Sequence, residues 1–294
     1  MTRTGDTTPA VLGRLRMPAA ALAALACPHC GQGLAPSENA LACGSGHGFD
    51  VAREGYVSLL TGRRTAGTGD SAQMVRARQE FQQAGHYAAL AARLAGLAGE
   101  AGTGGGLVVD AGAGTGYYLR TLLEEHGRAT GLALDVSKFA LRRAAKAHPR
   151  AGAAACDTWH GLPLRDGAAA LLLNVFAPRD GAEFRRVLHR GGALVVVIPT
   201  SRHLAELVAA LGLVSVDARK EERLEASLAE YFTPAHREEL DSPMLLSRAD
   251  VISVVGMGPS ARHLASGELR ERVAALPEPV SATASFAISV HRPC

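Results

Sequence analysis

Apolar runs alternate with amphipathic stretches along the chain from residue 107 onward. Short, continuously apolar runs are typical of parallel strands that are buried on both faces. These runs are Leu107–Val109, Ala129–Leu134, Ala153–Cys156, Ala168–Asn174 and, after an Arg190–Gly192 turn, Leu194–Ile198. Helices are expected at Tyr117–His126, Lys138–Ala147, Arg202–Leu213 and Glu221–Glu230, and antiparallel last strands at Tyr231–Leu245 and Thr283–His291. This alternation predicts a Rossmann-like α/β fold with a seven-stranded sheet.

A glycine-rich turn joins the first of these strands to its helix. Asp110 closes the strand, and Gly112, Gly114 and Gly116 follow at every second position. Glycines at such a turn allow positive φ and let a ligand lie against the main chain. The spacing is neither the G-x-G-x-x-G of dinucleotide-binding folds nor a phosphate loop. It resembles motif I of the class I S-adenosylmethionine (SAM)-dependent methyltransferases, which implies SAM as the cofactor.

Polar side chains follow four of the predicted strands. Asp110, Asp135, Asp157 and Asn174 each stand at or near the end of an apolar run. Because ligands of such folds bind at the carboxyl edge of the sheet, we expect these residues to gather around one site. Asp135 is placed to accept hydrogen bonds from ribose hydroxyls, although it or Ser137 is equally suited to cap the next helix. Asp157 stands where methyltransferases often contact adenine.

Three of the five cysteines cluster near the N-terminus in the stretch CPHCGQGLAPSENALACGSGH. Cys27 and Cys30 form a C-x2-C pair, and Cys43 and His47 form a C-x3-H pair. Two such pairs supply a tetrahedral set of thiolate and imidazole ligands, as in a structural zinc site. A disulfide or a free redox pair is the alternative. His29 lies inside the first knuckle and is badly placed to be a ligand.

Composition and hydropathy bear on whether the protein spans a membrane or is secreted. The chain has 294 residues, of which 47% are hydrophobic, and a net charge of +3. No apolar run reaches the ~18 residues of a membrane span, so we expect a cytoplasmic protein. The run Ala19–Ala26 mimics a short signal peptide, but Cys27 belongs to the zinc knuckle, so Pro18–Ala26 is expected to form a short helix. Met17 is an alternative start to Met1.

The first 88 residues are expected to be separate from the methyltransferase domain. We divide the chain into an N-terminal extension (1–26), a zinc-binding module (27–60), a basic connector with a linker helix (61–88) and the methyltransferase domain (89–294). Asp70 or Ser71 would cap the linker helix. Arginines gather between the zinc ligands and the glycine-rich turn, and we expect them to contact RNA phosphates unless they form only a solvated face; they are Arg53, Arg63, Arg64, Arg76 and Arg78.

Longer motifs extend the resemblance. CPxC…C-x3-H, FDxAxEGYVxLL, GDS-x2-M-x2-AR-x2-F-x3-GHY, D-x-G-x-G-x-GYY and LDVSK occur in this order. Together they resemble the 23S rRNA (guanine-N1)-methyltransferases of the RlmA type, from residue 27 to about residue 290. The high alanine, glycine and arginine content favours the TlrB-type branch, which confers resistance to tylosin-like macrolides. That family methylates N1 of one guanine in a hairpin loop of 23S rRNA domain II, beside the peptide exit tunnel.

The resemblance implies roles for individual residues. The zinc ligands match Cys27, Cys30, Cys43 and His47, and the cofactor contacts match Tyr87, Gly114, Thr115 and His203, beside Asp110, Gly112, Gly116, Asp135 and Asp157 from the pattern above. A glutamate stands at position 115 in better-known members. The guanine that accepts the methyl group is expected to lie at Asn174–Pro178. Relatives often continue with a cysteine there, and this chain has Arg179.

Methylation of guanine N1 requires loss of the N1 proton, so a base is expected. The candidates are Asp157, His160, Asp180 and Asn174, and water is another. Phe176, Trp159 or Tyr118 could stack on a flipped guanine. The expected partners are the 23S rRNA hairpin and a second copy of the chain in a homodimer, with no membrane. A small-molecule methyltransferase and a non-enzymatic zinc RNA-binding protein are the alternatives.

Overall fold

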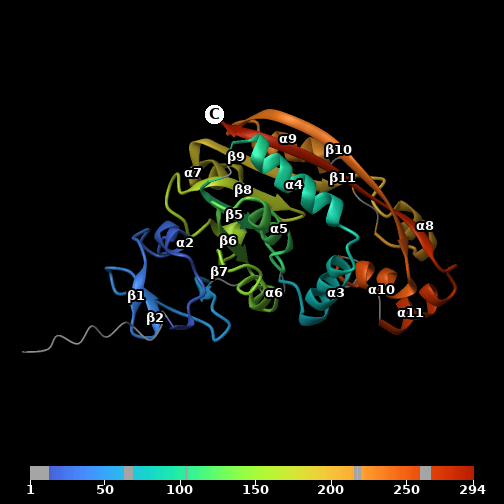
Figure 1. The fold of residues 1–294 in the computed structure, drawn as a ribbon, viewed down its shortest axis with the longest axis horizontal. Helices are drawn as coiled ribbons and strands as arrows, with labels where there is room; N and C mark the ends of the chain where they lie inside the picture. The colour runs from blue at the N-terminus through green and yellow to red at the C-terminus, as the bar shows by residue number, and fades with distance from the viewer. Residues whose placement is uncertain (1–12, 63–68, 103–104, 215–216, 218–219, 259–265) are drawn as a thin grey trace, which may run out of the picture.

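The computed structural model describes residues 13–62, 69–102, 105–214, 217, 220–258 and 266–294. Within these residues, an eight-stranded sheet has the order β10-β11-β9-β8-β5-β6-β7-β4 (Figure 1). All neighbours are parallel except β9, β11 and β10, which pair antiparallel. The strands are β4 (Val57–Ser58), β5 (Leu107–Ala111), β6 (Thr130–Asp135), β7 (Ala151–Ala155), β8 (Ala169–Val175), β9 (Leu188–Pro199), β10 (Phe232–Leu246) and β11 (Val280–Pro293).

Helices cover both faces of the sheet because successive strand residues point to opposite sides. Val108 packs into a core with helices on one face, and Val109 packs into a core on the other face. The first face carries α3 (Ala72–Gln83), α4 (Ala88–Glu100), α5 (Tyr117–Glu125), α6 (Lys138–Ala144), α8 (Ala205–Leu211), α10 (Arg248–Gly256) and α11 (Ser266–Ala274). The second face carries α2 (Ala19–Ala24), α7 (Gly181–Val187) and α9 (Lys220–Leu228).

The predicted class I methyltransferase architecture is confirmed. The seven expected strands are β5 to β11, and the switch in strand order falls between β5 and β8, where such folds bind ligands. Strand β4 adds an eighth by pairing with the edge of β7. Its two residues are too few for hydrophobic periodicity to indicate a strand.

The prediction of a turn at Arg190–Gly192 is wrong. These residues lie inside β9, where the pairing with β8 shifts from Ala169↔Leu188 to Leu171↔Ala193. Two adjacent glycines allow this irregularity without ending the strand. The motif therefore marks an irregularity within the strand, and β9 begins earlier than predicted.

The N-terminal residues form a small unit against the β7 edge of the sheet (Figure 1). Its antiparallel sheet consists of β1 (Ala35–Ser37), β2 (Ala40–Ala42) and β3 (Gly48–Asp50). A bridge between Leu25 and Leu164 and a shared apolar core fasten the unit to the main domain. Residues 1–12 of the predicted extension lie outside the described residues.

The linker helix begins as predicted. The hydroxyl of Ser71 accepts a hydrogen bond from the Met74 N–H at 3.2 Å and so caps α3. Helix α3 packs on α10, far along the chain, and buries Val75 and Phe81. Of the connector arginines, Arg63 and Arg64 lie outside the described residues. Within the part of the chain that the structure describes, no helix is long and apolar enough to cross a membrane.

Candidate methyltransferase and zinc sites

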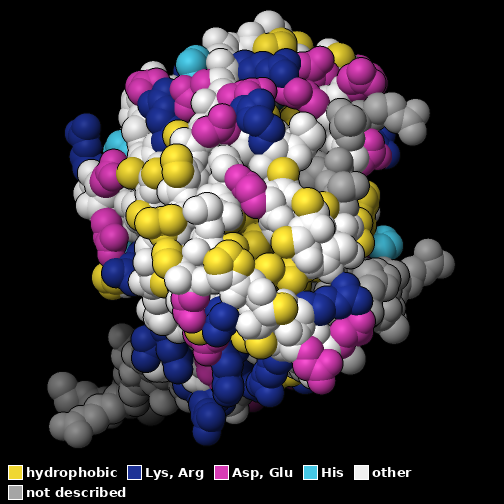
Figure 2. All heavy atoms as spheres, turned by 90° about the vertical axis from the view of Figure 1, so that its right-hand side faces the viewer, with side chains coloured by type: hydrophobic (Ala, Val, Ile, Leu, Met, Phe, Trp, Pro, Cys, Tyr) yellow, Lys and Arg dark blue, Asp and Glu magenta, His cyan; other side chains and the backbone are white. Residues whose placement is uncertain are grey.

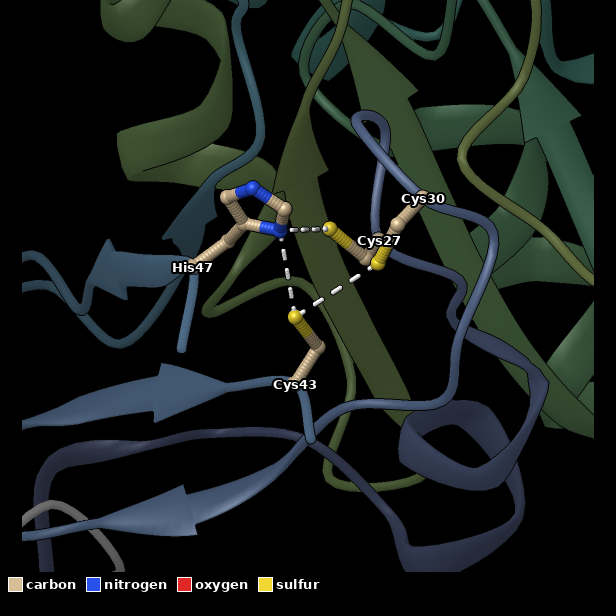
Figure 3. A group of neighbouring side chains, drawn as sticks. All are labelled: Cys27, Cys30, Cys43 and His47. Carbon is tan, nitrogen blue, oxygen red and sulfur yellow. Dashed lines mark hydrogen bonds between the residues drawn. The ribbon is translucent and has the colours of Figure 1, made fainter. Parts of the chain in front are cut away.

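The four predicted zinc ligands converge (Figure 3). The Sγ atoms of Cys27, Cys30 and Cys43 and a ring nitrogen of His47 all lie within 4.8 Å of one another. The His47 Nδ1 is 3.5 Å from Cys27 Sγ and 3.3 Å from Cys43 Sγ, and the Cys30 and Cys43 sulfurs are 3.6 Å apart. Tetrahedral zinc, with bonds of ~2.0 to 2.3 Å, needs ligand separations of this size. The donor set therefore fits one structural Zn²⁺.

Two tight turns hold the ligands. The Gly31 N–H donates to the Cys27 carbonyl at 2.8 Å, and the Gly46 N–H donates to the Cys43 carbonyl at 3.0 Å. Both glycines have positive φ, 71° and 85°. Each pair of ligands thus lies in a short turn that is closed by a backbone hydrogen bond.

The glycine turn after β5 is shaped for close approach of a ligand. Gly112, Gly114 and Gly116 have φ values of 88°, 55° and 79°, a region that favours glycine. A Cβ on Gly112 would lie 2.3 Å from the Cβ of Ala177. Glycine therefore lets the turn touch the loop that follows β8. The two loops together form the switch point of the sheet.

A cavity of about 290 Å³ opens beside this turn. Five of the predicted cofactor residues line it, namely Tyr87, Gly112, Gly114, Asp135 and Asp157. The other four lie behind its wall or beside it. Asp110 is buried beneath the turn, Thr115 and Gly116 line a neighbouring hollow, and His203 contacts Tyr87.

Asp135 shapes the turn as well as lining the cavity. Its Oδ2 accepts a hydrogen bond from the Gly114 N–H at 2.8 Å, and its Oδ1 accepts one from the Ser137 N–H at 2.7 Å. Burial raises the pKa of this carboxyl, and the two N–H groups partly offset the rise. The hydroxyl of Ser137 caps α6. Of the two residues expected to cap this helix, Ser137 therefore does so, and Asp135 lines the cavity.

Two buried polar groups at the glycine turn and the cavity have no hydrogen-bond partner among the described residues. They are the carboxylate of Asp110, which is 1% exposed, and the hydroxyl of Tyr118, which lines the cavity. Burial, with a contribution from the charge of Asp135, raises the pKa of Asp110 to about 7. Buried polar groups without partners are costly. Such groups fit a ligand that carries positive charge and hydrogen-bond donors.

Tyr87 presents a proton to the cavity. The His203 Nδ1 accepts a hydrogen bond from the Ser285 N–H at 3.2 Å, so the ring proton resides on Nε2. That Nε2 donates to the Tyr87 hydroxyl oxygen at 3.3 Å. The hydroxyl proton is then free to donate toward the cavity, and burial keeps the phenol protonated by raising its pKa. His203 therefore acts on the cavity by positioning Tyr87.

The loop after β8 presents an aromatic side chain at the cavity. Phe176 is 40% exposed and has a φ of 56°, unusual for this residue type. The amide of Asn174 donates to the carbonyls of Ala111 and Pro178, and its Oδ1 accepts a hydrogen bond from Arg179. Trp159, 61% exposed, also lines the cavity.

The candidate bases are dispersed. Asp157 lines the cavity, and its Oδ2 lies 3.1 Å from His160 Nδ1. His160 itself lines a separate hollow beside the zinc module. Asp180 caps α7 by accepting from the Glu183 N–H, and the Asn174 side chain is engaged in the loop. The structure thus brings one of the four into the cavity.

Sequence reasoning missed an ion pair in the cavity. Arg78 pairs with Asp70 and donates to the Met257 carbonyl at 3.1 Å, and all three residues line the cavity. Arg78, which the sequence groups with the arginines expected to contact RNA phosphates, thus lies at the cavity. The GDS and AR motifs gave a signal, because they set Asp70 and Arg78 two helical turns apart.

Similar proteins are known for the segment around the zinc site and for nearly the whole chain. The family model "RlmA, N-terminal" matches residues 25–63. A Micromonospora griseorubida protein named "Putative 23S rRNA (guanine-N(1)-)-methyltransferase" is 53% identical over 287 residues, which span 92% of this chain and 97% of that protein. The Streptomyces fradiae 23S rRNA (guanine(748)-N(1))-methyltransferase is 50% identical over 271 residues, 92% of this chain and 96% of that protein. A solved SAM-dependent methyltransferase from Aquifex aeolicus is 12% identical with a TM-score of 0.39, over 63% of this chain and 81% of that chain.

Proposed function

We propose that this chain, which belongs to the family of 23S rRNA (guanine-N1)-methyltransferases, transfers a methyl group from SAM to N1 of a guanine in a hairpin loop of 23S rRNA domain II. One observation carries the proposal. The match to the Streptomyces fradiae enzyme spans 92% of the chain, and so includes the zinc ligands, the glycine turn and the loop after β8.

The cavity fits the cofactor. When bound, SAM supplies a methyl group on a positively charged sulfur. Asp135 would accept hydrogen bonds from the ribose hydroxyls, and Arg78 would hold the carboxylate of the methionine part. Asp157 follows β7, three strands from β8, or ~14 Å at ~4.8 Å per strand. That separation suits a contact with adenine at one end of the cavity and methyl transfer at the other.

The acceptor guanine would enter beside the loop after β8. A base must leave its stack to reach a buried methyl group. Phe176 and Trp159 are exposed at the cavity and offer aromatic faces on which an extruded base could stack. Alignment of the acceptor nitrogen with the methyl group and the exclusion of water are the main contributions of the protein to the rate.

Kinetics can identify the group that removes the N1 proton of the guanine. Asp157→Asn, if Asp157 serves only the cofactor, should raise the KM for SAM and leave the pH profile of kcat unchanged. If Asp180→Asn or Asp157→Asn abolishes the acidic limb of the pH profile of kcat, the carboxylate replaced in that variant is the base.

The larger assembly and its role also belong to this proposal. We expect the enzyme to act in the cytoplasm as a homodimer, as the family resemblance implies, with the zinc held in a purely structural site. Methylation beside the peptide exit tunnel would confer resistance to tylosin-like macrolides. Light scattering of the zinc-loaded protein measures the oligomer directly.

Primer extension tests the proposal. rRNA from a strain that lacks this modification should be read through at the domain II hairpin, and expression of the chain should create a stop at one guanine. The same cells should become more resistant to tylosin. Full methylation of the hairpin without any change in resistance would refute the resistance role and leave the enzymatic one. No stop at any guanine of the hairpin would refute the enzymatic role.

A further inference from the structure

A basic hollow lies next to the cofactor cavity on the outer surface of α5 and α6. Its lining includes Arg120, Arg142, Arg143 and Lys146, against the single carboxylate of Glu54. Lys146 also lines an adjoining hollow with Arg16 and Arg150. The two hollows, which we call the basic band, thus share a wall. Figure 2 shows Lys and Arg side chains gathered in the lower part of one face of the molecule.

The charges in the basic band are poorly compensated. Arg142 lies 3.4 Å from Glu54, and Arg120 pairs with Glu124. Arg143 donates to two neutral acceptors, the Gln79 side chain and the Phe139 carbonyl.

The guanidinium of Arg150 likewise donates to main-chain carbonyls, among them those of His126 and Ala129. Lys146 has no ion-pair partner among the described residues. Six cations therefore face one carboxylate in the lining, although the whole chain carries a net charge of only +3.

The basic band is separated from the cofactor cavity by a thin wall. Gln82 lines both spaces, and its Oε1 accepts a hydrogen bond from the Thr115 hydroxyl at 2.7 Å. Glu54 belongs to the turn between β3 and β4, so the N-terminal unit contributes to the rim. A strand that passes over the band is therefore close to both the glycine turn and the N-terminal unit.

We infer that the basic band docks the sugar–phosphate backbone of the RNA substrate. The inference rests on the proposed function, because an RNA substrate supplies the polyanion. Arginines held by neutral acceptors keep their full charge and a fixed geometry, which suits phosphate oxygens. Such contacts position an RNA without reading its bases. The band contains none of the cavity aromatics, so it orients the hairpin while another surface receives the target base.

Charge removal at exposed positions tests this role. Arg142→Gln/Lys146→Gln alters two exposed side chains of the zinc-loaded full-length protein. Its affinity for the domain II hairpin, measured by fluorescence anisotropy, should fall by about tenfold near ~0.15 M salt. The slope of log affinity against log salt should flatten by about 1 to 2. SAM affinity and kcat at saturating hairpin should be unchanged. Glu54→Gln should act in the opposite direction, with tighter binding and a steeper slope.

A matched variant controls for net charge. Arg223→Gln/Arg237→Gln removes two cations from α9 and β10, on the opposite edge of the molecule from α6 (Figure 1), and should bind the hairpin like the wild type. An equal loss in this control would contradict the inference. Wild-type affinity and slope in Arg142→Gln/Lys146→Gln, with a wild-type protein that methylates the hairpin, would overturn the docking role alone. A wild-type protein that neither binds nor methylates the hairpin would overturn the proposed function and the docking role with it.

Discussion

Three aspartates at one edge of the sheet have different surroundings. Asp135 is hydrogen-bonded to two backbone N–H groups, and Asp157 is paired with His160. Asp110 is buried with no partner among the described residues. The same residue type therefore shapes a loop at Asp135, lines a cavity at Asp157 and holds a proton at Asp110. Burial, rather than residue type, raises the pKa values of Asp110 and Asp135.

At the residue scale, Asp135→Ala should weaken SAM binding. The change removes the acceptor that we propose for the ribose hydroxyls and the hydrogen bond that Asp135 accepts from the Gly114 N–H. We expect a loss of about 1–3 kcal/mol in binding free energy by calorimetric titration. Asp166→Ala, at a side chain that is 82% exposed, is the control. An unchanged SAM affinity in Asp135→Ala would show that the cofactor lies elsewhere.

The raised pKa of Asp110 predicts how stability depends on pH. The carboxyl ionises near 3.8 in the unfolded chain and near 7 in the folded protein. Between these values the folded state holds an extra proton, so the free energy of unfolding falls as pH rises from about 4 to about 7, then levels off.

Replacement of Asp110 by asparagine should remove this dependence. Urea unfolding of the cofactor-free protein should show Asp110→Asn gaining stability over the wild type as pH rises through that window, by on the order of a few kcal/mol at pH 8. Asp166→Asn should follow the wild type. Parallel curves for Asp110→Asn and the wild type would refute the buried, protonated state.

At the element scale, the glycine turn and the loop after β8 depend on each other. Gly112→Ala would force a Cβ against Ala177 at a backbone angle that disfavours side chains. We expect a loss of about 1–3 kcal/mol in stability and a weaker SAM affinity. Gly127→Ala is the matched control, because a Cβ there meets nothing within 4 Å. Equal effects of the two changes would contradict the packing argument.

Much of the fold could be predicted from the apolar runs. The strands β5 to β8 follow directly from buried, continuous runs, and the starts of α3 and α6 follow from the caps at Ser71 and Ser137. The pairing of β4 with β7 could not, because two residues carry no periodicity. The irregularity in β9 could not be predicted, because adjacent glycines also mark turns.

The candidate site was predicted less completely than the fold. The spacing of Cys27, Cys30, Cys43 and His47 was enough to predict their convergence, because both pairs are local in sequence. The location of Arg78 in the cavity depends on how α3 packs against α10. That packing joins segments far apart in the chain, and no local pattern encodes it.

At the scale of the whole molecule, the N-terminal unit is part of the main fold. Strand β4 extends the central sheet, and Cys27, Cys43 and Phe49 belong to the same apolar core as Leu164 and Phe184. Loss of zinc should therefore lower the stability of the methyltransferase domain as well. We therefore expect the zinc site to stabilise an edge of the sheet as well as its own knuckles.

Removal of two ligands tests this coupling. Cys27→Ser/Cys43→Ser should reduce the zinc content from about one equivalent to near zero, since a closed Cys3His site needs its full ligand set. The melting temperature should fall in the same transition as the main domain. Cys294→Ser changes an exposed cysteine outside the cluster and should keep its zinc. Full zinc content in the double variant would contradict the ligand assignment.

One measurement tests the central claim most directly. Purified, zinc-loaded protein is incubated with SAM and the domain II hairpin, and nuclease digests of the RNA are analysed by mass spectrometry. The account predicts one methyl group per hairpin, recovered as 1-methylguanosine from a loop guanine, and none when that guanine is already methylated at N1. A methyl group on another atom or nucleotide, or an unmodified hairpin from protein that binds SAM, would contradict it.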